Sequence, residues 1–432
     1  MDPIRLLAGR DYLPILSMND GMPVTRETWR ERREEMKTLL ETYSYGRTPG
    51  VPLRVSGKIL FEEPVPDIGA VRQKTQIVFE TERGVCSFPD EIFTPDAAKK
   101  PPVILNLAFR PVPDRYIPLG KILSAGYALV TAVYTDMVND AHFGDFSDGI
   151  AAHFGTSAVR APDEWGKIGM WAYGASRVLD YLLDGREDLD AAHTAVIGHS
   201  RLGKTALWCA ALDERFAAAI SNDSGYGGAA SSKHGAGERV TDFIRCGSWD
   251  WFCENFKNYT GDGEDRKPYD QSFLLAMIAP RFLCVGSAED DAGADPVSEF
   301  LTTLHASAAW ELLGSPGLIL PENRMPRPGD AWLDGLMAYL ADNVALLSRL
   351  LKEHLPFARM SPVEATYLAW LDLRAYDGSC TSMERKCKQA GVALTPGTFF
   401  GPEGEGFMRL NFGCPTAQLT EGVKRLKAAM RQ

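Results

Sequence analysis

In the first three quarters of the chain, segments with hydrophobic residues at helical spacing alternate with segments that have the hydrophobic pattern of β-strands. Apolar positions recur at helical spacing over residues 26–45, 165–183 and 299–313, which predicts helices there. Short alternating or continuous apolar runs predict strands around them. The predicted strands are 53–61, 71–79, 88–93, 103–108, 127–133, 195–197, 216–220, 281–286 and 317–320, with a long polar loop at 135–156. Antiparallel strands followed by alternating strands and helices predict a doubly wound α/β sheet.

The pattern changes near Ala331. Apolar residues at helical spacing over 332–355 predict one long amphipathic helix. Shorter elements follow: a strand at 365–373, a helix at 383–389, a strand at 407–411 and a last helix at 420–430. The sequence therefore predicts two domains, an α/β domain at 1–330 and a small α+β domain at 331–432.

The net charge and the distribution of apolar residues limit the kinds of molecule that the protein is expected to bind. The formal net charge is -11 over 432 residues, and no Lys/Arg-rich run offsets it, which argues against nucleic acid or an anionic membrane as the partner. The first residues do not read as a secretory signal, and nowhere do about eighteen apolar residues run together. We therefore expect a cytoplasmic protein with a small-molecule or carbohydrate substrate and leave its oligomeric state open.

The cysteines do not suggest a metal site or a disulfide framework. The chain has 8 cysteines and no C-x-x-C pair, so buried free thiols are expected.

One turn carries the clearest chemical signal. Residues 195–205 read AVIGHSRLGKT, in which a β-branched run enters a Gly-x-Ser turn and an apolar helical stretch leaves it. In an α/β-hydrolase such a strand–turn–helix is the nucleophile elbow, which lifts the serine hydroxyl above the sheet edge. The usual pattern is G-x-S-x-G, whereas here Leu202 stands at the second glycine position and Gly203 follows it. The alternative is a strand-to-helix turn in which Ser200 caps the helix.

Longer segments carry a family resemblance. The segments are GHSRLGK at 198–204, SNDSGYGGAA at 221–230, and IAPR at 278–281 with the acidic stretch 289–296. With these, residues 10 to about 330 resemble α/β-hydrolases of the glucuronoyl esterase and acetylxylan-esterase-like group. The resemblance implies that Ser200 is the nucleophile, that Arg201 helps to hold the oxyanion, and that Lys204 touches a sugar hydroxyl. The alternatives are a surface ion pair for Arg201 and a solvated helix position for Lys204.

A serine hydrolase also needs an acid and a base. Asp291, after the strand at 281–286, is the first candidate for the acid, with Asp290 beside it. Asp223 is the second candidate, because relatives in this group sometimes place a glutamate after the preceding strand. Asp295, before Pro296, is expected to start a helix.

The base is the missing part. The catalytic histidine normally follows the last strand, which places it between His305 and His354. The chain has no histidine in that interval. Its histidines are at 142, 153, 193, 199, 234, 305 and 354. His199 precedes Ser200 directly and cannot turn its ring onto it, so we expect an incomplete triad and a hydrolase domain that is truncated at its end.

The tail has a resemblance of its own. The segments EATYLAWLD at 364–372 and GFMRLN at 406–411 resemble the C-terminal small domain of pyridoxal-phosphate enzymes of the aminotransferase class I/II, cystathionine β-lyase-like branch. In that family the arginine matched by Arg409 binds the substrate carboxylate. The large domain with the Schiff-base lysine has no counterpart here, so the tail implies pyridoxal phosphate without the residues that would hold it, and no cofactor is expected for the hydrolase part.

The favoured hypothesis is a carboxylic ester hydrolase for acetyl or glucuronoyl esters of carbohydrates, impaired by the missing histidine. Two alternatives stay open. One is a fusion related to pyridoxal-phosphate lyases or aminotransferases, and the other is a sugar-binding protein without catalysis.

Overall fold

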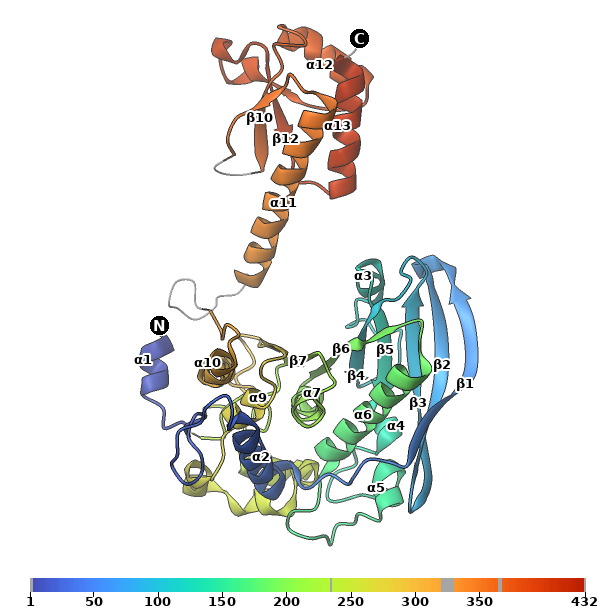
Figure 1. Cartoon of the computed structure of the whole chain (residues 1–432), viewed down its shortest axis with the longest axis vertical. Coiled ribbons are helices and arrows are strands. Elements are labelled where there is room, and N and C mark those ends of the chain that lie inside the picture. Colours follow the sequence, from blue (N-terminus) through green and yellow to red (C-terminus); the bar gives the residue numbers. More distant parts are fainter. Residues whose placement is uncertain (1–2, 234, 320–329, 364–366, 431–432) are drawn as a thin grey trace. The chain divides into compact units, whose positions relative to one another are not determined.

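The computed structural model describes residues 3–233, 235–319, 330–363 and 367–430. The chain divides into two compact units, Met1–Met325 and Pro326–Gln432 (Figure 1). Each unit has its own secondary structure and its own hydrophobic core.

The first unit is built on an eight-stranded sheet in the order β1-β2-β3-β5-β4-β6-β7-β8. Its first three strands and the β3–β5 pair are antiparallel, whereas β5, β4, β6, β7 and β8 run parallel. This is the mixed, doubly wound α/β sheet that the alternating pattern predicts. The strands are β1 (Arg54–Val65), β2 (Ala70–Thr81), β3 (Gly84–Pro95), β4 (Pro102–Ala108), β5 (Ala128–Val133), β6 (Asp190–His199), β7 (Ala218–Asn222) and β8 (Phe282–Gly286).

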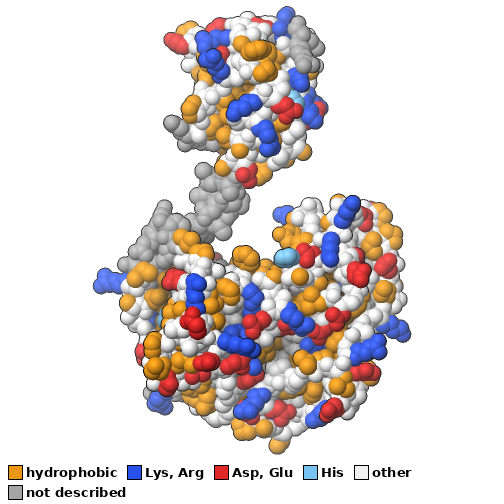
Figure 2. Space-filling model, viewed as in Figure 1, with side chains coloured by type: hydrophobic (Ala, Val, Ile, Leu, Met, Phe, Trp, Pro, Cys, Tyr) orange, Lys and Arg blue, Asp and Glu red, His pale blue; other side chains and the backbone are white. Residues whose placement is uncertain are grey.

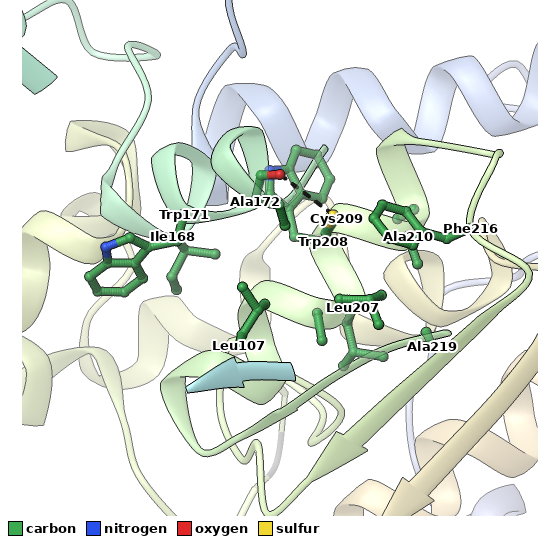
Figure 3. Close-up of a cluster of buried hydrophobic side chains, with 14 of the residues drawn as sticks. Leu107, Ile168, Trp171, Ala172, Leu207, Trp208, Cys209, Ala210, Phe216 and Ala219 are labelled. Atoms are coloured by element: carbon green, nitrogen blue, oxygen red, sulfur yellow. Dashed lines mark hydrogen bonds between the residues drawn. The ribbon is translucent and has the colours of Figure 1, made fainter. Parts of the chain in front are cut away.

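Helices cover the sheet and close the core. The longer ones are α2 (Trp29–Leu40), α6 (Lys167–Gly185), α7 (Arg201–Leu212) and α10 (Pro296–Leu313). Trp171 of α6 and Leu207 of α7 lie in one buried apolar cluster with Leu107 of β4 (Figure 3). Trp208 stacks on Tyr45 with ring centroids 4.4 Å apart. Burial of these large side chains fixes α7, and with it the turn that precedes it, against the sheet.

Several shorter helices connect these elements, and two of them correct the sequence prediction. The predicted loop at 135–156 contains α4 (Tyr134–Met137) and α5 (Gly149–Phe154), which are too short to show a helical period. The others are α1 (Pro3–Ala8), α3 (Leu119–Ser124), α8 (Val240–Cys246) and α9 (Gln271–Ala276), with a π-helical turn at Glu41–Tyr45 and 3₁₀ turns at Pro66–Ile68, Ser248–Trp251, Glu254–Asn258 and Gly261–Arg266.

The strand predicted at 317–320 is not formed. Residues 317–319 lie outside any strand, and Leu320 lies outside the described residues. Within the described part of the chain the sheet therefore ends at β8, whose Phe282 is 81% exposed.

The second unit is a small α+β structure. It begins with α11 (Asp330–His354) and contains a four-stranded sheet in the order β11-β12-β10-β9. The strands are β9 (Arg359–Met360), β10 (Leu368–Asp372), β11 (Thr395–Pro396) and β12 (Phe407–Asn411). The other helices are α12 (Cys380–Gln389) and α13 (Thr416–Met430), with 3₁₀ turns at Gly397–Phe400 and Pro402–Gly404. The predicted strand at 365–373 is thus shorter, and residues 364–366 lie outside the described residues.

The described surface carries both signs of charge. On the face of the first unit visible in Figure 2, basic and acidic side chains lie interspersed. Among the described residues, no helix combines the length and the apolar character that a membrane crossing requires.

Candidate active site

The turn between β6 and α7 holds Ser200 in a strained backbone conformation. Ser200 has φ 55° and ψ -125°, a region that residues other than glycine rarely occupy. Two main-chain hydrogen bonds fix it: Ser200 N donates to Asn222 O at 2.8 Å, and Lys204 N donates to Ser200 O at 3.1 Å. A sharp strand-to-helix reversal with a serine at this conformation has the geometry of a nucleophile elbow.

Glycines make this reversal possible. A Cβ at Gly198 would lie 2.1 Å from the carbonyl oxygen of Leu202, so only glycine lets the helix backbone approach the strand. At Gly203 a Cβ would meet Ser221 Oγ and Ser224 Cβ at 3.1 Å. The late second glycine, which departs from the usual pattern, therefore packs α7 against the loop after β7.

The start of α7 offers positive charge beside Ser200. The first N–H groups of a helix have no acceptor within the helix and favour a negative charge. The guanidinium of Arg201 adds a full charge there. It forms an ion pair with Asp140 and lies 4.5 Å from the centroid of the Trp251 ring. The Arg201 Nε atom is buried and has no hydrogen-bond partner among the described residues.

Asp140 holds the guanidinium in place. Its Oδ1 accepts a hydrogen bond from Trp251 Nε1 at 2.8 Å, and its Oδ2 accepts one from the Tyr134 hydroxyl at 2.9 Å. Burial and the neighbouring Asp140 carboxylate raise the pKa of Tyr134 to about 12, which keeps the hydroxyl protonated as a donor. The Asp140 side chain is mostly buried, so Arg201 is not in a solvated surface ion pair.

Lys204 is buried rather than solvated. It is 2% exposed, and its Nζ donates to Ser224 O at 2.6 Å and contacts Glu238 Oε2 at 3.4 Å. Burial lowers the pKa of Lys204, and the Glu238 carboxylate acts in the opposite direction. The interpretation of Lys204 as a solvated helix residue is therefore wrong. Its partner Glu238 keeps a partly exposed carboxylate.

The two candidate acids have different surroundings. Asp223 follows β7 with φ 43°, and its Oδ2 lies 3.9 Å from Nδ1 of His199, next to Ser200. Its Oδ1 accepts a hydrogen bond from Ala288 N of the loop after β8. Asp291 instead accepts from Gly293 N and Ala294 N in an exposed turn, and Asp290 is also exposed. The structure thus brings Asp223 to the elbow and uses Asp291 to form a turn.

Two further carboxylates shape these loops. Asp295 caps α10 by accepting from Ser298 N at 3.1 Å, as its position before Pro296 predicts. Glu299 of α10 is fully buried and accepts from Ser224 Oγ at 2.9 Å and Gly225 N at 2.8 Å. Burial raises the pKa of Glu299. It also accepts from the Ser287 hydroxyl, so it ties the loops after β7 and β8 together.

In the part of the chain that the structure describes, no imidazole is hydrogen-bonded to Ser200. His199 Nδ1 is paired with Asn222 Oδ1 at 2.8 Å, on the strand side of the turn. His142 Nδ1 lies 3.3 Å from Ser248 Oγ, on the loop that carries Asp140. The other described histidines have partners elsewhere: His153 pairs with Thr81, His193 with Asp190, His305 with Leu13, and His354 contacts Lys427. His234 lies outside the described residues.

Sequence reasoning missed Asp140, Trp251, Glu238 and Glu299. Asp140 offered one usable signal, because it follows the carboxyl end of a predicted strand, where ligands of open α/β sheets bind. Trp251 and Glu299 are remote in sequence from the residues they hold, so no local pattern marks them.

The second unit places Arg409 on β12. Its Nη2 donates to Thr395 Oγ1 at 3.1 Å, and its guanidinium lies 5.0 Å from the centroid of the Phe400 ring. Two lysines of this unit form ion pairs: Lys386 with Asp377, and Lys388 with Glu384. Pyridoxal phosphate, which the resemblance of the tail implies, stays a prediction. The described residues contain no cluster of ligands for a metal ion.

The fold and the strained serine turn together define an α/β-hydrolase, and comparisons with known proteins give the family. Residues 77–314 match the family model for fungal glucuronyl esterases. Carbohydrate esterase MZ0003, from an unknown prokaryotic organism, is 34% identical over 70% of this chain and 78% of its own length. A 4-O-methyl-glucuronoyl methylesterase of Schizophyllum commune is 28% identical over 69% of this chain and 73% of its own. The chain belongs to the glucuronoyl esterase family, carbohydrate esterase family 15.

Solved structures agree with this assignment. The glucuronoyl esterase from Solibacter usitatus aligns with a TM-score of 0.66 and 34% identity, over 74% of this chain and 89% of that one. The tail resembles other proteins: cystathionine beta-lyase PatB of Bacillus subtilis is 45% identical over 103 residues. Those residues are 24% of this chain and 27% of the relative, so the chain spans about a quarter of that lyase.

Proposed function

We propose that this chain binds a carbohydrate ester of a uronic acid and cleaves it through Ser200, with low turnover. The observation that carries the proposal is the strained Ser200 turn beside the Asp140-held guanidinium of Arg201. A glucuronoyl ester is favoured over an acetyl ester because relatives in the same family are named for 4-O-methyl-glucuronoyl esters.

The chemistry follows from the geometry. Attack of the serine oxygen on the ester carbonyl places negative charge on the carbonyl oxygen. The Arg201 N–H at the start of α7 and the guanidinium, held by Asp140 and Trp251, stabilise this charge without having to reorganise. The partly exposed carboxylate of Glu238, oriented by Lys204, accepts a hydrogen bond from a sugar hydroxyl.

The base limits the rate. Without an imidazole on the serine hydroxyl, the proton of Ser200 has no acceptor of suitable pKa. Loss of the histidine from a complete triad costs roughly 10⁶-fold in turnover. Asp223, the carboxylate next to the elbow, would have oriented such an imidazole and serves here as the remaining member of the triad.

The test is hydrolysis of methyl glucuronate and of an aryl acetate by the full chain, beside Ser200→Ala. We expect slow, serine-dependent release of methanol from the glucuronate. Ser124→Ala is the control, because Ser124 is an exposed serine at the end of α3. Turnover as fast as that of Solibacter usitatus glucuronoyl esterase, assayed alongside, would show that a histidine such as His234 completes the triad.

Absence of an imidazole at Ser200 among the described residues favours one alternative, binding without catalysis. Titration with methyl glucuronate, followed by tryptophan fluorescence, distinguishes binding alone from catalysis, since Trp251 lies against Arg201 and reports on the site. Saturable binding without any turnover would assign the chain as a sugar-binding protein. Neither binding nor turnover would contradict both functions.

A further inference from the structure

Phe143 is a large apolar side chain that the fold holds out in solvent. It is 70% exposed and has φ 65°, a backbone region that bulky residues almost never adopt. Its backbone is fixed by a hydrogen bond from Phe143 N to Gly247 O at 3.0 Å. Strained residues of this kind concentrate at functional sites, where the surrounding structure enforces them.

The ring of Phe143 rests flat on Gly247. A Cβ added to Gly247 would lie 2.9 Å from each of Cε1, Cε2 and Cζ of the ring. A point equidistant from these three atoms lies on the axis through the ring centre, so Gly247 sits beneath the middle of one face. Since one face is covered and the residue is 70% exposed, the opposite face is open to solvent. Any side chain at position 247 would displace the Phe143 ring from this position.

The loop that carries this ring is bonded to residues around Arg201, next to Ser200. This loop carries Asp140, which holds Arg201, and the loop is bonded at several points to the segment 247–251. Gly144 N donates to Asp250 Oδ2 at 3.1 Å, and His142 Nδ1 lies 3.3 Å from Ser248 Oγ. Trp251, at the end of the same segment, stacks on Arg201. The same two segments, the loop after β5 and residues 247–251, therefore hold both the Phe143 ring and the guanidinium of Arg201.

We propose that the open face of Phe143 is a stacking platform for a pyranose ring of the carbohydrate chain that carries the ester, beyond the sugar whose ester Ser200 attacks. This inference rests on the proposed function. The C–H face of a pyranose carries partial positive charge and complements the negative face of an aromatic ring. The ring is already fixed by Gly247, so stacking costs little conformational entropy.

A sugar fits this surface better than an aromatic alcohol would. His142, which precedes Phe143 in the chain, has an exposed imidazole. An imidazole can bond to a hydroxyl at the rim of a pyranose, whereas an aromatic alcohol would not offer that bond.

The experiment is isothermal titration of the full chain carrying Ser200→Ala, which prevents cleavage of the ligands. The probes are methyl glucuronate as a single sugar, the same ester linked to xylotriose, and the benzyl ester of the single sugar. The variants are Phe143→Ala, Phe143→Asn, which removes the ring but tolerates positive φ, and Phe143→Trp. Phe282→Ala is the control, because Phe282 is another strongly exposed phenylalanine, on β8.

We expect Phe143→Asn to weaken binding of the xylotriose-linked ester about three- to tenfold, with the single sugar unchanged and Phe143→Trp retaining affinity. Unchanged affinity of Phe143→Asn for the xylotriose-linked ester, with single-sugar binding intact, would overturn the platform and leave the proposed function standing. A loss confined to the benzyl ester would overturn it in favour of an aromatic alcohol. Failure of the Ser200→Ala chain to bind either sugar would overturn both.

Discussion

At the scale of single residues, the strain at Ser200 is sustained by its neighbours. A non-glycine residue at φ 55° and ψ -125° persists only where other contacts determine its conformation. Here Asn222 O and Lys204 N bond the two ends of the serine peptide, and the absence of a side chain at Gly198 lets Leu202 O approach. The strained conformation of this partly buried serine is thus a product of the packing around it.

Gly198→Ala should destabilise the first unit by about 1–3 kcal/mol, since its Cβ would lie 2.1 Å from a backbone oxygen that cannot move without shifting α7. Urea unfolding followed by tryptophan fluorescence measures the change. Gly120→Ala in α3 is the control, because a Cβ there meets nothing within 4 Å. Equal stability of the two variants would mean that the turn can relax, and that Ser200 is not held as described.

At the scale of elements, alternation along β3 places an acid in the core. Phe88, Asp90 and Ile92 share the buried face of the strand. Neither carboxylate oxygen of Asp90 has a hydrogen-bond partner among the described residues. Burial raises the pKa of Asp90 to about 8, so the fold favours the protonated form.

This burial predicts how stability depends on pH. Below about pH 4 Asp90 is protonated in the folded and the unfolded chain; between pH 4 and 8 only the folded chain keeps the proton. The contribution of Asp90 to the free energy of unfolding is therefore full below pH 4 and is lost as pH rises to about 8. Asp90→Asn, which cannot ionise, should gain stability relative to the unsubstituted chain across this range.

The measurement is urea unfolding of both chains between pH 4 and 8, compared as a difference so that other groups cancel. Asp67→Asn serves as the control, because Asp67 is exposed in the turn after β1. A constant difference between Asp90→Asn and the unsubstituted chain would show that Asp90 is ionised in the folded state.

The elements also show what the sequence could predict. The parallel strands were predictable because a strand buried on both faces is almost entirely apolar, as in β5, whose only polar side chain is Thr131. The helices α4 and α5 were not, because one or two turns show no period. Ser200 was predictable from a local pattern. Its surroundings were not, since Trp251 and Asp140 meet from positions 111 residues apart.

The acid shows the same limit. Asp223 and Asp291 both follow strands, and no local pattern ranks one above the other. The pairing of β6 with β7 separates their surroundings, because it sets His199 against Asn222 and brings the next residue, Asp223, to the elbow. The role of Asp223 as the acid stays a prediction.

At the scale of the whole molecule, two cores divide the chain. The core of the first unit includes Leu207 and Trp208 of α7, and that of the second includes Met383 and Leu371. A unit of about a hundred residues with its own core is large enough to fold by itself. The stability of each unit should then depend on its own packing.

Truncating a fully buried side chain in each core tests this independence. Met383→Ala and Leu207→Ala each leave a cavity, which costs about 2–5 kcal/mol in the unit that contains it. Calorimetry of the full chain should show two transitions, with Met383→Ala lowering the temperature of one and Leu207→Ala that of the other. The two variants serve as controls for each other. If a single transition shifted with both variants, the units would unfold together, and ester binding by the first would depend on the integrity of the lyase-like tail.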